Sequence, residues 1–276
     1  MGGGSIAGVP TAGTVGLPVS FALNYKWDWS GEDIKVYGLS FSTGIGGWSV
    51  FGELSKTKDL PVQINGVDLL RGATSGAGPL AFLATAPRNV GTLQTGYDLK
   101  DKTQVQVSTL KIFPQVVGAE SLTLIGEVAY QHWNDIGNPA TDRRYGRGFV
   151  FGQASWSGTS GSLTCSSASS PNVSYCDMGG YATPNAWGYR AQVSLSYPNV
   201  FAGINAKPRV FWSHDVKGYS ADNLFNQDRQ TLSLGMQLDY LSKYYADLSY
   251  TRYNHNAKYD VFHDRDFYSV VVGVNF

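Results

Sequence analysis

The sequence predicts an all-β protein, an antiparallel transmembrane β-barrel with short periplasmic turns and long extracellular loops. Three observations predict this fold. Segments of about ten residues, the length of a tilted strand that crosses a bilayer, alternate between apolar and polar side chains. The connections between these segments alternate between short and long, as they do in outer-membrane barrels. The last segment ends on an aromatic residue, Phe276.

The composition agrees with a surface that faces lipid. Only 15% of the residues are charged and 13% are aromatic, whereas charged residues make up about a quarter of a soluble domain. The 21 basic and 21 acidic side chains balance, so the chain lacks the positive field that nucleic-acid binding requires. No apolar run reaches the length of about 18 residues that a transmembrane helix needs. We therefore expect no nucleic-acid partner, and strands as the only elements that could span a membrane.

The domain organisation is simple. We expect residues 1–17 to form a flexible Gly-rich segment and residues 18–276 to form the β-barrel domain. Residues 1–5 have neither a basic start nor an apolar core, so we expect no secretory signal in this chain. This indicates a start that is trimmed, fragmentary or engineered.

Five strands are expected in the first half of the chain. They cover residues 18–27, 33–43, 48–56, 103–113 and 121–132, and the first of them alternates least clearly. Short connections are expected at residues 42–47 and 114–120, and long surface loops at about 56–102 and 133–187. Residues 90–99 and 149–156 also have β character. They are either extra strands, which would raise the count from about ten to about twelve, or hairpins within the loops, which we favour.

Alternation is clearest in the second half of the chain. It is nearly perfect over residues 231–240 and recurs at 190–197, 207–215, 246–251 and 268–276. Short turns are expected at 198–203 and 241–243, and long loops at 217–228 and 254–264. Counting back from a periplasmic carboxyl terminus places every long connection outside. The last strand resembles the signal by which the barrel assembly machinery recognises outer-membrane barrels, and its residues are Tyr268, Val270, Val272, Val274 and Phe276.

Aromatic residues gather near the predicted strand ends. They predict two interfacial girdles, which would contact outer-membrane lipid and lipopolysaccharide. The residues expected on one side are Tyr197, Tyr240, Tyr244 and Phe276, and those on the other are Tyr130, Trp212, Tyr250 and Tyr268.

The polar faces of the strands are expected to line the lumen. Their charges either set pore selectivity or form ordinary pairs that hold the water network, and we favour the pairs. His214 and Asp215 are successive strand residues that face opposite ways, so they cannot form a catalytic dyad; we expect His214 at the interface beside Trp212. The lumen residues are Lys207, Arg209, Asp215, Gln237, Asp239 and Asp247.

Two loop features have an apolar or covalent character. Cys165 and Cys176 are the only cysteines; we expect a disulfide, typical of an oxidising compartment, with two free thiols as the alternative. Residues 66–72 could form a short helix that carries Val67, Leu69 and Leu70. These side chains would form either a constriction at the extracellular mouth or, as we favour, a packing contact of the loop on the barrel rim.

Two polar loop clusters are more ambiguous. Arg143, Arg144 and Arg147 could touch lipopolysaccharide phosphates, but a solvated loop is favoured. A cluster in the last long loop has the residue types of a divalent-cation site, yet solvated polarity explains it better. We therefore expect neither a metal nor a cofactor. The cluster consists of His255, Asp260, His263 and Asp264.

Several stretches of the sequence carry a further signal. They include Glu32-Asp-Ile-Lys-Val-Tyr-Gly-Leu-Ser-Phe41, Asn185-Ala-Trp-Gly-Tyr-Arg190 and Trp212-Ser-His-Asp-Val-Lys-Gly-Tyr219. Together these stretches resemble an uncharacterised proteobacterial outer-membrane family, domain-of-unknown-function family thirteen-hundred-and-two. The resemblance implies that the chain corresponds to the carboxyl-terminal half of longer members, so the barrel could be partial. It also implies, through gene neighbourhoods, a role in moving aromatic, steroid or other lipophilic compounds.

Three functions remain open. The leading prediction is an outer-membrane channel or facilitator for small, possibly lipophilic or aromatic, solutes. The second is a structural or adhesive surface barrel that acts through its loops. The least favoured is an outer-membrane hydrolase: the chain contains no nucleophile elbow, phosphate loop or zinc-binding motif, so we do not expect an enzyme.

Overall fold

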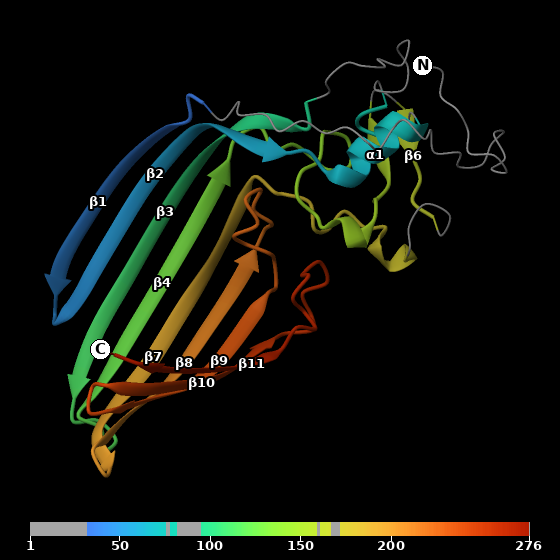
Figure 1. The fold of residues 1–276 in the computed structure, drawn as a ribbon. Coiled ribbons are helices and arrows are strands. Elements are labelled where there is room, and N and C mark those ends of the chain that lie inside the picture. The colour runs from blue at the N-terminus through green and yellow to red at the C-terminus, as the bar shows by residue number, and fades with distance from the viewer. Residues whose placement is uncertain (1–31, 76–77, 82–94, 159–160, 167–171, 276) are drawn as a thin grey trace. The chain divides into compact units, whose positions relative to one another are not determined.

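The computed structural model describes residues 32–75, 78–81, 95–158, 161–166 and 172–275. Within these residues it contains a nine-stranded antiparallel sheet, a separate two-stranded sheet and one α-helix (Figure 1). The predicted all-β, antiparallel class is therefore confirmed. Within the same residues, no helix is both long enough and apolar enough to cross a membrane.

The strands of the large sheet follow one another in chain order, except that β5 and β6 are left out. The two short strands pair with each other and flank a connection outside the described residues. The strands of the large sheet are β1 (Lys35–Ile45), β2 (Trp48–Gln63), β3 (Tyr97–Pro114), β4 (Ser121–Trp133), β7 (Asn185–Phe201), β8 (Ile204–Lys217), β9 (Gln230–Tyr240), β10 (Tyr244–Tyr253) and β11 (Phe267–Val274). The remaining elements are α1 (Gly66–Ser75), β5 (Trp156–Gly158) and β6 (Gly161–Leu163).

Nine of the predicted strands are confirmed by these elements, and the tenth, at residues 18–27, lies outside the described residues. The extra strand considered at 149–156 is wrong as a crossing strand, because Phe149–Phe151 forms a 3-10 helix and Trp156 begins the short β5. The described end of the 90–99 segment is the beginning of β3. At residues 149–156, the β character of the sequence therefore does not produce an additional strand of the large sheet.

One predicted turn is displaced. The sequence predicts a turn at residues 198–203, between the predicted strands at 190–197 and 207–215, but β7 continues to Phe201. The pairing with β8 shifts register between Tyr197 and Phe201, and Asn199 within this irregularity has a φ of 49°. A bulge accommodates Pro198, which has no N–H to donate to the sheet. The turn itself falls at Ala202 and Gly203, where both φ values are positive.

The chain divides into two compact units. Unit 1 takes in residues 58–101 and 134–182, and within its described part it holds α1, β5 and β6. Its core is aromatic and includes Trp156 and Tyr181, which are both almost fully buried. Unit 2 takes in residues 36–57, 102–133 and 183–276, and holds most of the large sheet.

The sheet of unit 2 has one apolar face that is open to the surroundings. In β11, Val270 is 69% exposed and Val272 is 74% exposed. Leu248 of β10 is directly opposite Val270 in the antiparallel register, and side chains directly opposite each other project from the same face. Figure 1 shows that the sheet twists, so that β10 and β11 run across the direction of β3 and β4. The alternation read from the sequence therefore corresponds to two chemically distinct faces.

Candidate functional site

The polar face of the sheet carries most of the charged residues predicted from the strand pattern. Lys207 of β8 is opposite Gln237 of β9, and Gln237 is opposite Asp247 of β10. Arg209 and Asp239 lie two residues away from members of this row, and alternation returns a side chain to the same face every second residue. The structure thus brings these five predicted lumen residues onto one face, and the sixth, Asp215, shares that face farther along β8. Their role as the lining of a lumen stays a prediction.

Arg209 and Asp247 form a bidentate ion pair across β9. The guanidinium Nη1 and Nη2 atoms donate to the two carboxylate oxygens at 2.6 and 2.7 Å. The arginine crosses over Gly235, where a Cβ atom would lie 2.7 Å from the guanidinium carbon. Glycine at this position is thus required by the close approach of the side chain. Because the two side chains remain 29% and 25% exposed, the pair contributes less than about 1 kcal/mol to stability.

Further hydrogen bonds on the polar face link neighbouring strands. Gln106 of β3 donates to Glu127 of β4 at 2.9 Å. Thr251 of β10 donates to Ser233 of β9 at 3.0 Å. Both contacts agree with the expectation that polar groups on this face pair with one another.

Asp215 belongs to the same face by alternation, but its surroundings differ from those predicted. Its carboxylate is buried and lies 2.6 Å from the Arg229 guanidinium. It also accepts a hydrogen bond from the backbone N–H of Asn226 at 3.0 Å. The connection after β8 folds back over this end of the strand, which a strand pattern does not reveal. Asp215 therefore holds a connection in place.

The opposite face carries His214. Its ring meets Tyr189 edge-on at a centroid distance of 5.6 Å, and the indole N–H of Trp212 donates to the Tyr189 hydroxyl at 3.4 Å. His214 and Asp215 thus project from opposite faces, as their succession along β8 predicts.

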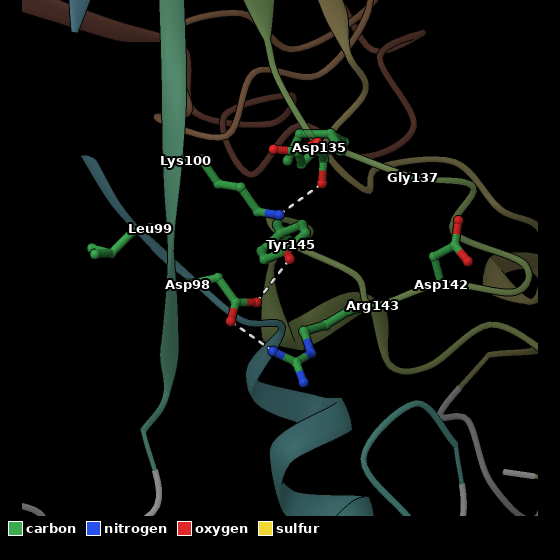
Figure 2. Close-up of a pocket in the computed structure, with 9 residues that line it drawn as sticks. Asp98, Leu99, Lys100, Asp135, Gly137, Asp142, Arg143 and Tyr145 are labelled. Carbon is green, nitrogen blue, oxygen red and sulfur yellow. Dashed lines mark hydrogen bonds and ion pairs between the residues drawn. The ribbon is translucent and has the colours of Figure 1, made fainter. Parts of the chain in front are cut away.

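Unit 1 contains a polar cavity of about 570 Å³ that the sequence did not predict (Figure 2). Asp98 lies at its centre and accepts hydrogen bonds from Arg143 at 2.6 Å and from the Tyr145 hydroxyl at 2.8 Å. Lys100 donates to the backbone carbonyl of Asp135 at 2.7 Å. These residues are separated by 35 to 47 positions in the chain, and no local pattern links such distant positions.

The electrostatics of this cavity favour a donor role for Tyr145. Burial, and then the hydrogen bond to Asp98, raise the pKa of the Tyr145 hydroxyl well above its usual value. The hydroxyl therefore stays protonated across the physiological range. The cavity is lined by paired charges and hydroxyl donors, an arrangement that suits a small polar solute. Its remaining lining residues are Leu99, Ile136, Gly137 and Asp142.

The prediction of a solvated basic loop is wrong for two of its three arginines. Arg144 is fully buried, donates from Nε to Asp68 at 2.7 Å and stacks over Tyr181 at 4.7 Å. Arg147 is also buried and donates to the carbonyls of Asp177 and Gly179, both at 2.9 Å. Arginine suits such sites because its planar fork satisfies several acceptors at once. Only Arg143, whose side chain is 40% exposed, resembles the solvated residue that was expected.

The short helix predicted at residues 66–72 is confirmed as α1. Asn65 caps it, since its side-chain oxygen accepts from the N–H groups of Val67 and Asp68 at 3.1 and 3.2 Å. Val67 is buried, and Leu69 and Leu70 are half-buried. Their role as a constriction stays a prediction.

Two further predictions concern the disulfide and the last strand of the chain. Cys165 and Cys176 form the predicted disulfide. In β11, the four described residues of the predicted assembly signal alternate on one face and are exposed, and Phe276 lies outside the described residues. These four are Tyr268, Val270, Val272 and Val274.

The polar cluster in the last long loop contains one residue, Asp260, whose burial the sequence did not predict. Asp260 is fully buried, and its backbone carbonyl contacts His263 Nδ1 at 2.7 Å. A short loop motif rich in polar residues gives no signal that one of them is buried. Within the described part of the chain, no group of three or more His, Cys, Asp or Glu side chains is arranged to hold a metal ion.

Comparisons with known proteins give one match. A family model described as "Protein of unknown function (DUF1302)" matches residues 11–276. No curated protein and no solved structure matches the chain.

Proposed function

The chain belongs to the DUF1302 family, and on this premise we propose that its large sheet is part of an outer-membrane β-barrel through which small solutes diffuse along the polar face. The observation that carries this proposal is the separation of the sheet into an exposed apolar face and a polar, internally paired face. A lipid-exposed barrel wall has this same alternation.

Exposure of the apolar face supports the membrane location. Soluble proteins rarely leave a contiguous apolar patch of more than a few hundred Å² open to water. Residues from four neighbouring strands contribute to this face at 45% exposure or more. They are Val210, Leu234, Leu248, Tyr268, Val270 and Val272.

Paired aromatic rings support interfacial girdles at both ends of the strands. Tyr240 and Tyr244 stack at 6.4 Å at one end of β10, and Tyr250 and Tyr268 stack at 4.6 Å six residues along the same strand. Six residues of a strand span about 20 Å, which is close to the apolar band of about 25 Å in outer-membrane barrels. Lipid, lipopolysaccharide and the barrel assembly machinery are the partners that such a protein would have.

The polar face supports passage of solutes. Lys207, together with the Arg209–Asp247 pair, provides charged groups that water reaches. Lipophilic or aromatic solutes are suggested only by the genes near members of the family that the chain resembles.

A second candidate is a structural or adhesive surface barrel that acts through its loops. The compact core of unit 1 favours it, because a disulfide and a buried ion pair give the loops a fixed structure. Loss of cell attachment, with unchanged solute uptake, after removal of residues 134–182 would favour this candidate over the channel.

Planar-bilayer conductance tests the proposal. The refolded chain should give discrete current steps, and Lys207→Glu should shift the reversal potential toward cation selectivity. Arg252→Glu is the matched control: it makes the same charge change at an exposed position opposite Leu232, on the apolar face. An inserted, β-rich protein without current steps, or equal shifts in both variants, would contradict the channel.

A further inference from the structure

The connection between β8 and β9, residues 218–229, lies on the polar face of the sheet within unit 2. It contacts β3, β4 and β7 near the strand ends from which the long connections leave. It makes a charged and an apolar contact with residues of these strands on the same face as Arg209 and Asp247, and it is buttressed by the connection between β10 and β11.

The charged contact is made by Asp222. Its carboxylate lies 3.1 Å from Lys102 Nζ of β3 and accepts from Gln131 Nε2 of β4 at 3.0 Å. Gln131 also donates to Gln104 at 3.0 Å and accepts from the Trp133 indole at 3.1 Å. Gln131 is 0% exposed, so the connection and its neighbours cover the polar face completely at this point.

Asp222 remains charged in this setting. Burial disfavours its ionised form, but hydrogen bonds from Ser220 and from the Leu224 N–H, together with Lys102, outweigh it and hold the pKa below its usual value. The anchor on Lys102 and Gln131 therefore persists throughout the neutral range. A neutral side chain would make weaker bonds at the same place.

The apolar contact is made by Phe225. Its ring is 4% exposed and packs against Ala129 of β4 and Ala186 of β7. Small residues on the strands thus create the space that the ring fills.

The buttress comes from the connection between β10 and β11. Asn226 Nδ2 donates to the Tyr259 carbonyl at 3.0 Å, and the rings of Tyr219 and Tyr259 meet edge-on at 6.3 Å. On the other side, Arg229 binds the buried Asp215. The connection is therefore fixed at both ends and in the middle.

The same face is open further along the strands. Arg209 and Asp247 keep 29% and 25% of their side chains exposed, and Lys207 is exposed. The polar face is thus covered at the end with long connections and accessible toward the short turns.

We propose that residues 218–229 form the constriction of the solute path, with Asp222 and Phe225 holding it in place and thereby setting the size limit for solutes. This rests on the proposed channel function. It assigns the constriction to the β8–β9 connection, whereas the sequence offered Val67, Leu69 and Leu70 as one alternative and favoured a packing contact for them.

The test uses the full chain carrying Asp222→Ala together with Phe225→Ala. We expect the unit conductance to rise roughly twofold or more, because pore conductance depends on the width of the narrowest segment. Proteoliposomes should also admit larger neutral polyethylene glycols. Asp228→Asn is the matched control: it lies in the same connection and also removes one negative charge, but its carboxylate accepts from the adjacent Gln227 and, among the described residues, bonds to none of the strands. Asparagine also tolerates the positive φ of 66° at that position.

Trypsin cleavage after Arg229 reports independently whether the connection has opened. Arg229 is bound to Asp215 in the native structure, so cleavage should be slow in the native chain and in Asp228→Asn, and fast in the double variant. A native chain that conducts, with a double variant that is cleaved fast but conducts identically, would overturn the constriction and leave the channel standing. If neither the native chain nor the double variant conducts, although trypsin cleaves the double variant fast, both the channel and the constriction are contradicted. A silent native chain and a conducting double variant would support both.

Discussion

At the scale of single residues, the structure departs most from the sequence where charged side chains are buried. Asp68 and Arg144 are 76 residues apart and both side chains are fully buried. Charged residues are almost never fully buried unless they are paired, and a partner so distant in the chain cannot be identified from local patterning. Arg209 contrasts with this pair, because alternation along β8 is enough to predict its face.

Asp68→Ala should destabilise unit 1 severely. It leaves the Arg144 guanidinium buried without its counter-charge, which costs about 3–5 kcal/mol. Hydrogen exchange of peptides that contain Trp156 and Tyr181, followed as a function of urea, measures the loss. Arg143→Ala is the control, since its half-exposed pair with Asp98 contributes about 1 kcal/mol or less. Equal effects of the two variants would mean that the buried pair has no special role. Replacing both Asp68 and Arg144 by apolar residues should restore most of the stability.

At the scale of elements, the strands were predictable, whereas the packing of connection 218–229 onto the strands was not. The period of two identifies β9 to within one residue and β10 to within two residues at each end, because each strand has one face of each polarity. β2 and β3 extend past their predicted limits, to Gln63 and back to Tyr97. The sequence predicts an ordinary surface loop for connection 218–229 because the anchors of this connection, Lys102 and Gln131, belong to distant strands.

The β10–β11 connection should open more readily as pH rises. Burial raises the pKa of Asp260 above its usual value of 3.8, and Arg229 and His263 oppose this shift while Asp215 adds to it. The folded connection therefore holds a proton that the opened chain releases. The bound proton stabilises the closed form at low pH, and this stabilisation is lost as pH rises through the raised pKa of Asp260.

Hydrogen exchange of residues 254–266 measures this effect. Asp260→Asn should slow exchange relative to the native chain near pH 7, and the two should converge near about pH 4, where the native carboxyl is also largely protonated. The neighbouring exposed Asp264→Asn should follow the native profile. A constant difference between Asp260→Asn and the native chain at every pH would exclude the titration of Asp260 as the cause.

At the scale of the whole chain, the two faces of the sheet determine where the protein can reside. Leu248 is 45% exposed on the apolar face, and Gln237 lies on the polar face between Lys207 and Asp247. If the apolar face contacts lipid, a charge there must be moved into hydrocarbon, whereas a charge on the polar face stays in water.

Leu248→Lys should weaken folding into phospholipid vesicles by about 2–4 kcal/mol. Gln237→Lys should leave it nearly unchanged. Urea titration of the vesicle-inserted chain, followed by tryptophan fluorescence, measures both. Similar small losses for the two variants would show that lipid does not cover the apolar face, and the membrane proposal would then fail.

The chain-order succession of strands in the large sheet has a kinetic consequence. When a strand pairs with its sequence neighbour across a short connection, only a short loop is closed. Most of the large sheet can therefore form by adding one hairpin after another. Two pairs are different, because residues 64–96 must first be looped out for β2–β3 and residues 134–184 for β4–β7. Closing the longer of these loops, at β4–β7, costs roughly 2 kcal/mol more entropy than closing a short turn. Registration of β7 against β4 is therefore the expected slow step of assembly, and a chain stalled there would carry two separately zipped halves of the sheet.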